Sequence, residues 1–284
     1  MLFKSALTSR IALGLASLIG FASYSLPSVA ATERVRLAIN NTVERSDLPS
    51  VDFLEPSTIY FSQRRRRYRP PSDARLPRRS HSGGGVRGCG EEILAIAPRS
   101  SSIGQTTSTR PTLTWYNYSN SAEPLELHLY RYEAEAAGAE AAALTPILIK
   151  PLAASQVGYA SYTLSERDPA LEPGQTYFWQ VILYCDPNLE EVGRWTSADI
   201  QVVLPPATVS EQLADDSLRN AEIYAEAGFW YDAIAQISNL EDSMTNAFLQ
   251  TLLLELAELE GEAIDDSAEA IRDQLRQVVE QASP

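Results

Sequence analysis

Side chains that act as bases or metal ligands are scarce in this chain. Its 284 residues include two histidines, His81 and His128, and two cysteines. Histidine is the commonest general base, and zinc sites need several nitrogen or sulfur ligands. We expect His128 to be exposed on the outward face of the strand LELHLYRY (125–132), with no G-x-S-x-G elbow near it. The sequence therefore predicts no catalytic residue, no metal site and no cofactor.

Carboxylates are abundant, but they occur as adjacent pairs such as Asp215-Asp216 and Asp265-Asp266. Such pairs at helix starts usually cap the helix or interact with its dipole. EF-hand spacing is absent, and the glycines at 83–85 lack the Gly-Lys-Ser/Thr ending of a phosphate loop. A hydrolase of the two-carboxylate glycosidase kind remains a remote alternative, because its residues need share no local motif.

Arginine is concentrated in one segment. Residues 64–88 hold nine arginines and one acid, a net charge of +8, whereas residues 207–284 hold 17 acids and three arginines, a net charge of −14. Guanidinium groups bind phosphate and carboxylate groups in pairs of hydrogen bonds, so this tract is a candidate polyanion-binding site. The alternatives are a solvated spacer, or a contact with the acidic helices of the same or a neighbouring molecule. The candidate residues are Arg64, Arg65, Arg66, Arg67, Arg69, Arg75, Arg78 and Arg79.

The first 30 residues predict an export signal. Lys4 and Arg10 precede a mostly apolar run over 11–26, and residues 28–30 offer a small-x-small cleavage site, with an uncleaved anchor as the alternative. Elsewhere no apolar run reaches the roughly 18 residues that a membrane span needs. In an oxidising compartment Cys89 and Cys185 can form a disulfide, the alternative being two unpaired buried thiols. We expect a periplasmic or extracellular protein with no transmembrane helix after signal removal.

Residues 91–206 carry about seven short strand patterns separated by turn residues. In LEPGQTYFWQVILYC (171–185), a turn feeds an alternating apolar strand, as in the tyrosine corner of immunoglobulin-like and fibronectin type III domains. We therefore expect an antiparallel β-sandwich of that type. The corner residues are Leu171, Pro173, Gly174 and Tyr177, and the expected strands cover 93–97, 112–118, 125–132, 144–149, 158–164, 177–185 and 194–204.

After Pro205 and Pro206 the apolar period changes from 2 to 3.6, which predicts about four helices. The first would begin near Val209, with Thr208 and Glu211 as a capping box, and end at Gly228. Residues 221–240 resemble a single tetratricopeptide-type helix pair, although repeat arrays usually need about three copies. We expect an aromatic partner-binding surface at Phe229, Trp230 and Tyr231, part of which should be core.

Four motifs resemble, in order, those of a bacterial and mostly cyanobacterial family known as domain of unknown function 928. They are RGCG (87–90), RPTLTWYNY (110–118), LEPGQTYFWQVILYC (171–185) and YAEAGFWYDAIAQISNL (224–240). The resemblance spans roughly residues 80–260 and implies an architecture, an export signal and both cysteine positions, but no activity. The arginine-rich region before Cys89 and the run 134–143 depart from the family pattern.

We expect four segments: a signal peptide (1–30), a flexible Arg/Pro/Gly-rich segment (31–90), a β-sandwich domain (91–206) and an acidic helical domain (207–284). The leading hypothesis is an exported, non-enzymatic envelope protein that binds another protein through its helices, and no nucleic acid. The alternative is a binder of anionic polysaccharide or lipid headgroups. Besides the arginines, that alternative uses exposed aromatics, namely Tyr116, Tyr118, Tyr130 and Tyr132.

Overall fold

The computed structural model describes residues 67–73, 75–77, 89, 92–120, 123–133, 143–153, 156–238 and 242–282. All of them belong to the second of two compact units into which the chain divides, residues 61–284. The predicted signal peptide lies outside the described residues, as does most of the predicted flexible segment.

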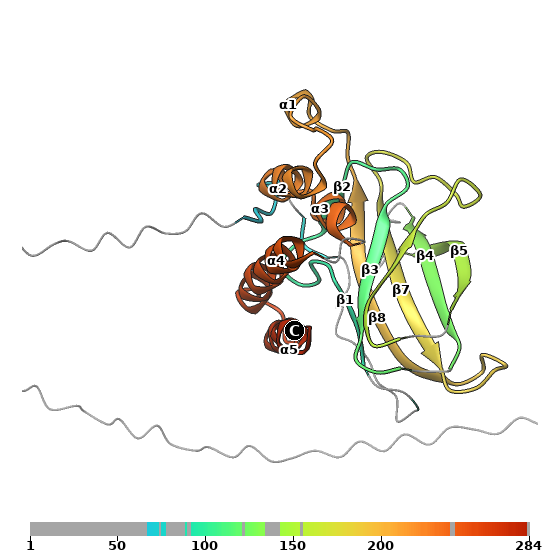
Figure 1. The fold of residues 1–284 in the computed structure, drawn as a ribbon. Helices are drawn as coiled ribbons and strands as arrows, with labels where there is room; N and C mark the ends of the chain where they lie inside the picture. Colours follow the sequence, from blue (N-terminus) through green and yellow to red (C-terminus); the bar gives the residue numbers. More distant parts are fainter. Residues whose placement is uncertain are drawn as a thin grey trace, which may run out of the picture. The chain divides into compact units, whose positions relative to one another are not determined.

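Eight strands form two sheets (Figure 1). The three-stranded sheet has the order β1-β3-β6 and is antiparallel; its strands are β1 (Ile93–Ala95), β3 (Thr112–Asn117) and β6 (Gly158–Thr163). The five-stranded sheet has the order β2-β8-β7-β4-β5, in which only the β2–β8 pair is parallel. Its strands are β2 (Gly104–Thr106), β4 (Leu125–Tyr132), β5 (Leu144–Leu152), β7 (Thr176–Tyr184) and β8 (Val192–Val202). Each expected strand range overlaps an observed strand, whereas β2 was not expected, because three residues are too few to show alternation.

The central strand β7 follows the period of two. Trp179, Val181 and Leu183 are fully buried and belong to the core that both sheets share. At the turn before β7, the Tyr177 hydroxyl accepts a hydrogen bond of 2.9 Å from the backbone N–H of Glu172. Gly174 adopts a φ of +86°, a left-handed conformation that favours glycine. The turn thus fixes where β7 enters the sheet.

Five helices follow: α1 (Ala207–Ser210), α2 (Ser217–Ala227), α3 (Trp230–Ile237), α4 (Ser243–Gly261) and α5 (Ala268–Gln281). The predicted capping box was wrong, because α1 begins after Pro206 without a side-chain cap and ends within one turn. Instead Asp216 caps α2 by accepting a hydrogen bond from the N–H of Arg219. Gly228 ends α2 as expected, with a φ of +91°.

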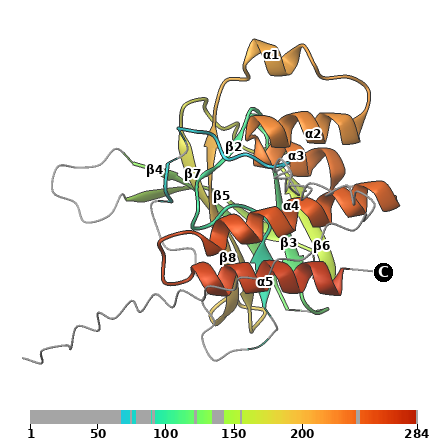
Figure 2. The same cartoon turned by 90° about the vertical axis from the view of Figure 1, so that its left-hand side faces the viewer.

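The helices and sheets share one hydrophobic core. The helices lie on one side of the sheets and face the viewer in Figure 2. Trp230, at the start of α3, donates its indole N–H to the carbonyl of Ile96, 2.8 Å away. The neighbouring Tyr231 hydroxyl accepts from the indole of Trp179 (2.8 Å) and donates to the carbonyl of Asp199 (2.9 Å). Helix α3 is therefore part of the interior of the sheet region.

The two cysteines form a disulfide with a Cα–Cα distance of 5.2 Å and a sequence separation of 96. A Cβ placed on Gly193 would lie 2.9 Å from the Cys185 sulfur, so glycine at this position makes room for the bridge. We expect the Cys89→Ser/Cys185→Ser double substitution to lower the free energy of unfolding by about 4 to 5 kcal/mol in the loop-entropy model. Denaturant unfolding with and without reductant measures this. Reductant should destabilise the native chain and leave the double variant unchanged. Equal stability of the native chain and the double variant in the absence of reductant would contradict the prediction.

A second local anchor lies in the loop between β6 and β7. The Asp168 carboxylate accepts hydrogen bonds from the Tyr162 hydroxyl (2.6 Å) and from the N–H and hydroxyl of Ser165. The hydrogen bond from Tyr162, which has the largest effect, and those from Ser165 hold the pKa of Asp168 well below its usual range. Lys150, at the edge of the five-stranded sheet, lies 3.6 Å from the same carboxylate. Asp168 therefore joins the edges of both sheets.

A lowered folded-state pKa means that Asp168 stabilises the fold above its unfolded pKa of about 3.9, and that this contribution is lost as the pH falls further. We expect Asp168→Asn to be less stable than the native chain at pH 7, and the difference to shrink progressively below about pH 4. Denaturant unfolding at pH 7, 4 and 3 measures it. Asp215→Asn, at an exposed position, is the control and should change little. A difference that stays constant with pH would contradict this role for Asp168.

Candidate functional site

An N-terminal segment crosses the helices. We call the described residues 67–73 and 75–77 the strap. Tyr68 is fully buried, its ring meets that of Trp230 edge to face at 4.8 Å, and its N–H donates to Glu255 on α4. The backbone N–H of Arg69 donates to the carbonyl of Ala225 on α2. One buried aromatic ring and these backbone hydrogen bonds thus fix the strap against three helices.

The loop that follows β1 is held by a buried acid. Glu260, near the end of α4, has no exposed surface. Its carboxylate accepts hydrogen bonds from the backbone N–H groups of Arg99 (3.0 Å) and Ser100 (2.6 Å). The hydroxyl of Ser101 donates to it as well, at 2.6 Å. A buried carboxylate that receives several N–H and O–H groups fixes the loop relative to α4.

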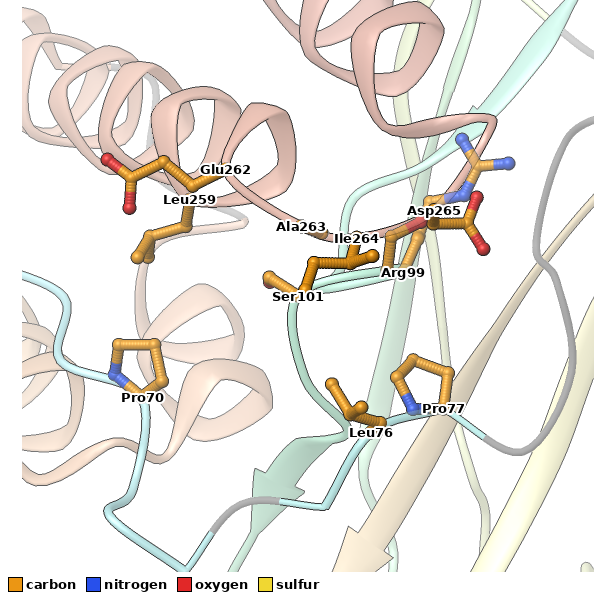
Figure 3. Close-up of a pocket in the computed structure, with 11 residues that line it drawn as sticks. Pro70, Leu76, Pro77, Arg99, Ser101, Leu259, Glu262, Ala263, Ile264 and Asp265 are labelled. Carbon is orange, nitrogen blue, oxygen red and sulfur yellow. The ribbon is translucent and has the colours of Figure 1, made fainter. Parts of the chain in front are cut away.

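A cleft of about 530 Å³ opens between the strap, this loop and the turn from α4 to α5 (Figure 3). Its exposed apolar rim includes Leu76 from the strap, which is 72% exposed, and Ile264 from the turn, which is fully exposed. A volume of this size lies in the range of small-molecule and cofactor sites. The other lining residues are Pro70, Pro77, Arg99, Ser100, Ser101, Leu259, Glu262, Ala263 and Asp265.

The two carboxylates that line the cleft point in different directions. In Figure 3 Glu262 points away on the α4 side, whereas Asp265 lies beside Arg99 on the other side. A glycosidase needs two carboxyl groups facing one bond from opposite sides. Burial lowers the pKa of Arg99 to about 10, and its guanidinium donates to Gln274 on α5. Glu262 and Asp265 thus do not face each other across the cleft, as the two carboxyl groups of a glycosidase do.

A second cluster of titratable side chains lies on the outward face of the five-stranded sheet. His128 lies 2.8 Å from Glu126 through Nε2 and 2.9 Å from the Tyr130 hydroxyl through Nδ1. The Tyr184 hydroxyl also donates to Glu126, and burial, followed by the charge of Glu126, raises the pKa of Tyr184 to about 12. Because both ring nitrogens are engaged, His128 can act as a base only if this network breaks.

The prediction of an exposed His128 was wrong, since the residue is 8% exposed. Residues 126, 128 and 130 alternate along β4, and Tyr184 lies on the neighbouring strand β7. The side chains on this face cover one another. The alternation of Glu, His and Tyr in LELHLYRY places these side chains on one face of the strand, and this hydrogen-bond network could have been predicted from it.

The sequence matches the family described as Domain of Unknown Function (DUF928) over residues 82–266, more than half of the chain. The chain belongs to the DUF928 family. The matched range contains all eight strands, helices α1 to α4 and both cysteines, whereas the strap and α5 lie outside it. The DUF928 cleft is thus built partly from family residues and partly from flanking segments. No curated protein matches the sequence.

Solved structures resemble the DUF928 chain only distantly. A lytic polysaccharide monooxygenase from Cellvibrio japonicus is 10% identical, with a TM-score of 0.25, and the match covers 35% of this chain and 54% of that one. The third fibronectin III domain of human KIAA0343 protein is 8% identical, with a TM-score of 0.22 and coverages of 49% and 93%. Astrotactin-2, a vertebrate-specific membrane protein, is 10% identical, with a TM-score of 0.24 and coverages of 64% and 37%. The chain spans about half the length of the monooxygenases that it matches.

Three members of the predicted polyanion-binding tract are described, and two of them contact the chain's own helices. The Arg67 guanidinium pairs with Glu222 on α2 at 2.9 Å and lies over the ring of Phe248 on α4. Arg69 contacts α2 through its backbone, and the carbonyl of Arg75 accepts a hydrogen bond from the N–H of Ile103. The remaining candidates, Arg64, Arg65, Arg66, Arg78 and Arg79, lie outside the described residues.

The predicted aromatic partner surface was wrong. Phe229, Trp230 and Tyr231 are 4%, 0% and 2% exposed, respectively. Gly228 ends α2 and reverses the chain there, so that the first turn of α3 enters the core. Of the four tyrosines expected to be exposed, Tyr116 and Tyr132 are buried. The other two are partly buried, and their hydroxyls are bonded: Tyr118 to the carbonyl of Gln274, and Tyr130 to His128.

In the described part of the chain, no three His, Cys, Asp or Glu side chains lie close enough to hold a metal ion together. No helix in that part is long and apolar enough to cross a membrane.

The role assigned to Glu260 is testable. We expect Glu260→Gln to destabilise the DUF928 domain by about 2 to 3 kcal/mol, because an amide loses the charge and offers one oxygen to several donors. Urea unfolding followed by tryptophan fluorescence measures this. Glu258→Gln is the matched control, because this side chain is exposed on the same helix and its substitution should change stability little. Equal stability of the two variants would show that Glu260 does not hold the loop.

Proposed function

We propose that this DUF928 protein is an exported, non-enzymatic protein-binding module of the cell envelope, and that the cleft is its binding surface. The observation that carries the proposal is the exposure of Leu76 and Ile264 on the rim of a cleft of about 530 Å³. Exposed apolar groups that gather around a concavity are typical of interaction sites.

The sheet region would serve as a rigid scaffold of the immunoglobulin or fibronectin III type. The strand orders β1-β3-β6 and β8-β7-β4-β5 support this, as does the Tyr177 hydroxyl bonded to Glu172. The α2–α3 pair would be a tetratricopeptide-like unit, with Gly228 at its turn. Export is supported by the disulfide and by the signal-like sequence of residues 1–30.

The partner is proposed to be a protein segment that combines an apolar side chain with positive charge. The apolar rim residues Leu76 and Ile264 favour the apolar side chain. The surrounding residues 207–284 carry a net charge of −14, which attracts cationic partners over a longer range.

In-cell cross-linking on an envelope fraction tests the proposal. We expect the native chain to give a discrete cross-linked protein, and Leu76→Asp/Ile264→Asp to reduce its yield at least tenfold by removing the apolar contacts. Leu204→Asp is the control, because Leu204 is 75% exposed and lies outside the cleft. Equal loss in the control would contradict the assignment of the cleft. Envelope retention that is lost at high salt, without any protein partner, would favour the polysaccharide or lipid alternative.

A further inference from the structure

The strap occupies its groove as a bound peptide does. The helices bind residues 67–71 of the strap in three ways. A closed pocket holds the Tyr68 ring, a carboxylate pairs with Arg67, and a backbone carbonyl accepts a hydrogen bond from the N–H of Arg69. Tyrosine and arginine anchors of this kind dominate the binding energy of protein interfaces. The groove itself is supplied by α2, α3 and α4.

The groove is shaped for this peptide. A Cβ on Gly228 would lie 2.8 Å from the ring of Pro71 and 2.9 Å from the carbonyl of Arg69, so the absence of a side chain there lets the strap approach the turn between α2 and α3. Beside Arg69 lies a hollow of about 240 Å³ whose lining includes Glu222 and Glu226 together with Arg219, which lies 3.7 Å from Glu222. Shape and charge therefore both fit a cationic, proline-containing segment.

The chain between the strap and the sheets is long enough to let the strap bind a second molecule. Eleven residues, 78–88, separate Pro77 from Cys89, where the disulfide fixes the chain to the end of β7. A segment of this length spans up to about 40 Å when extended. That reach is comparable with the diameter of a small domain, so a strap can reach the groove of a neighbouring molecule as well as its own.

We propose that the strap is exchanged between two copies of this chain, so that Tyr68 of each copy fills the groove of the other. The one peptide that the structure shows to fit the groove is residues 67–71, and a second copy carries the same residues. Exchange of an identical element preserves every contact and is a common route to a symmetric dimer. The inference concerns self-association and does not depend on the cleft or on its partner.

A charge exchange between two full-length variants tests this. Arg67 and Glu222 are 50% and 35% exposed at their side chains, so their reversal leaves the core intact. In Arg67→Glu alone, or in Glu222→Arg alone, the strap meets a like charge on its own groove. When the two variants are mixed, both exchanged contacts in the heterodimer pair opposite charges. Arg219, 3.7 Å from Glu222, is affected equally in the exchanged and unexchanged arrangements.

Native mass spectrometry distinguishes the species, because the two variants differ in mass. We expect a concentration-dependent dimer for the native chain, its loss in Tyr68→Ala, and a roughly tenfold excess of heterodimer over either homodimer in the mixture. The Arg67→Glu/Glu222→Arg double variant restores the pairing within one chain and should dimerise as the native chain does. Monomers alone at all concentrations, or a dimer that persists in Tyr68→Ala, would overturn the proposal. A statistical mixture, in which the heterodimer is about twice as abundant as each homodimer, would show association through another surface.

Discussion

The insertion of α3 into the sheet region is the constraint on which the rest of this structure depends. Tyr231 reaches the paired strands β7 and β8 from a helix about thirty residues further along the chain, and its hydroxyl joins the indole of Trp179 to the backbone of β8. A buried hydroxyl needs both of these partners, so the helix has one position relative to the sheets. Through α3, the positions of α2 and α4 are set as well, and with them the groove and one wall of the cleft.

Buried polar groups at the edges of this core fix the orientation of loops and helices relative to one another. Glu260 fixes the loop after β1 to α4, and Asp232 on α3 accepts hydrogen bonds from the N–H and hydroxyl of Thr107. Burial raises the pKa of Asp232, because the hydrogen bonds from Thr107 compensate only part of the cost of burying the charged form. Such contacts specify register and orientation, whereas the apolar core provides most of the stabilisation.

The sequence was sufficient to predict features that depend on local periodicity. Alternation along 177–185 gave the buried face of β7, and Gly228 marked the end of α2, because both signals depend on near neighbours. It was insufficient to show that Phe229, Trp230 and Tyr231 are buried, because an amphipathic helix does not indicate which distant surface will cover it. Tyr68 gave no signal either, since a single aromatic residue among arginines has no period. The cleft combines elements separated by nearly two hundred residues, and only the tertiary fold brings them together.

The position of the disulfide relative to the strap has a mechanical consequence. Cys89 follows the strap after eleven residues and is bonded to Cys185 at the end of β7. Tension applied ahead of the strap therefore passes along it to Cys89, crosses the sulfur atoms and continues beyond Cys185. Residues 90–184 lie outside this load path and cannot be extended while the bond is intact. A pull on the N-terminal side would release the strap first, because it is held by few contacts, and would leave most of the strands unloaded.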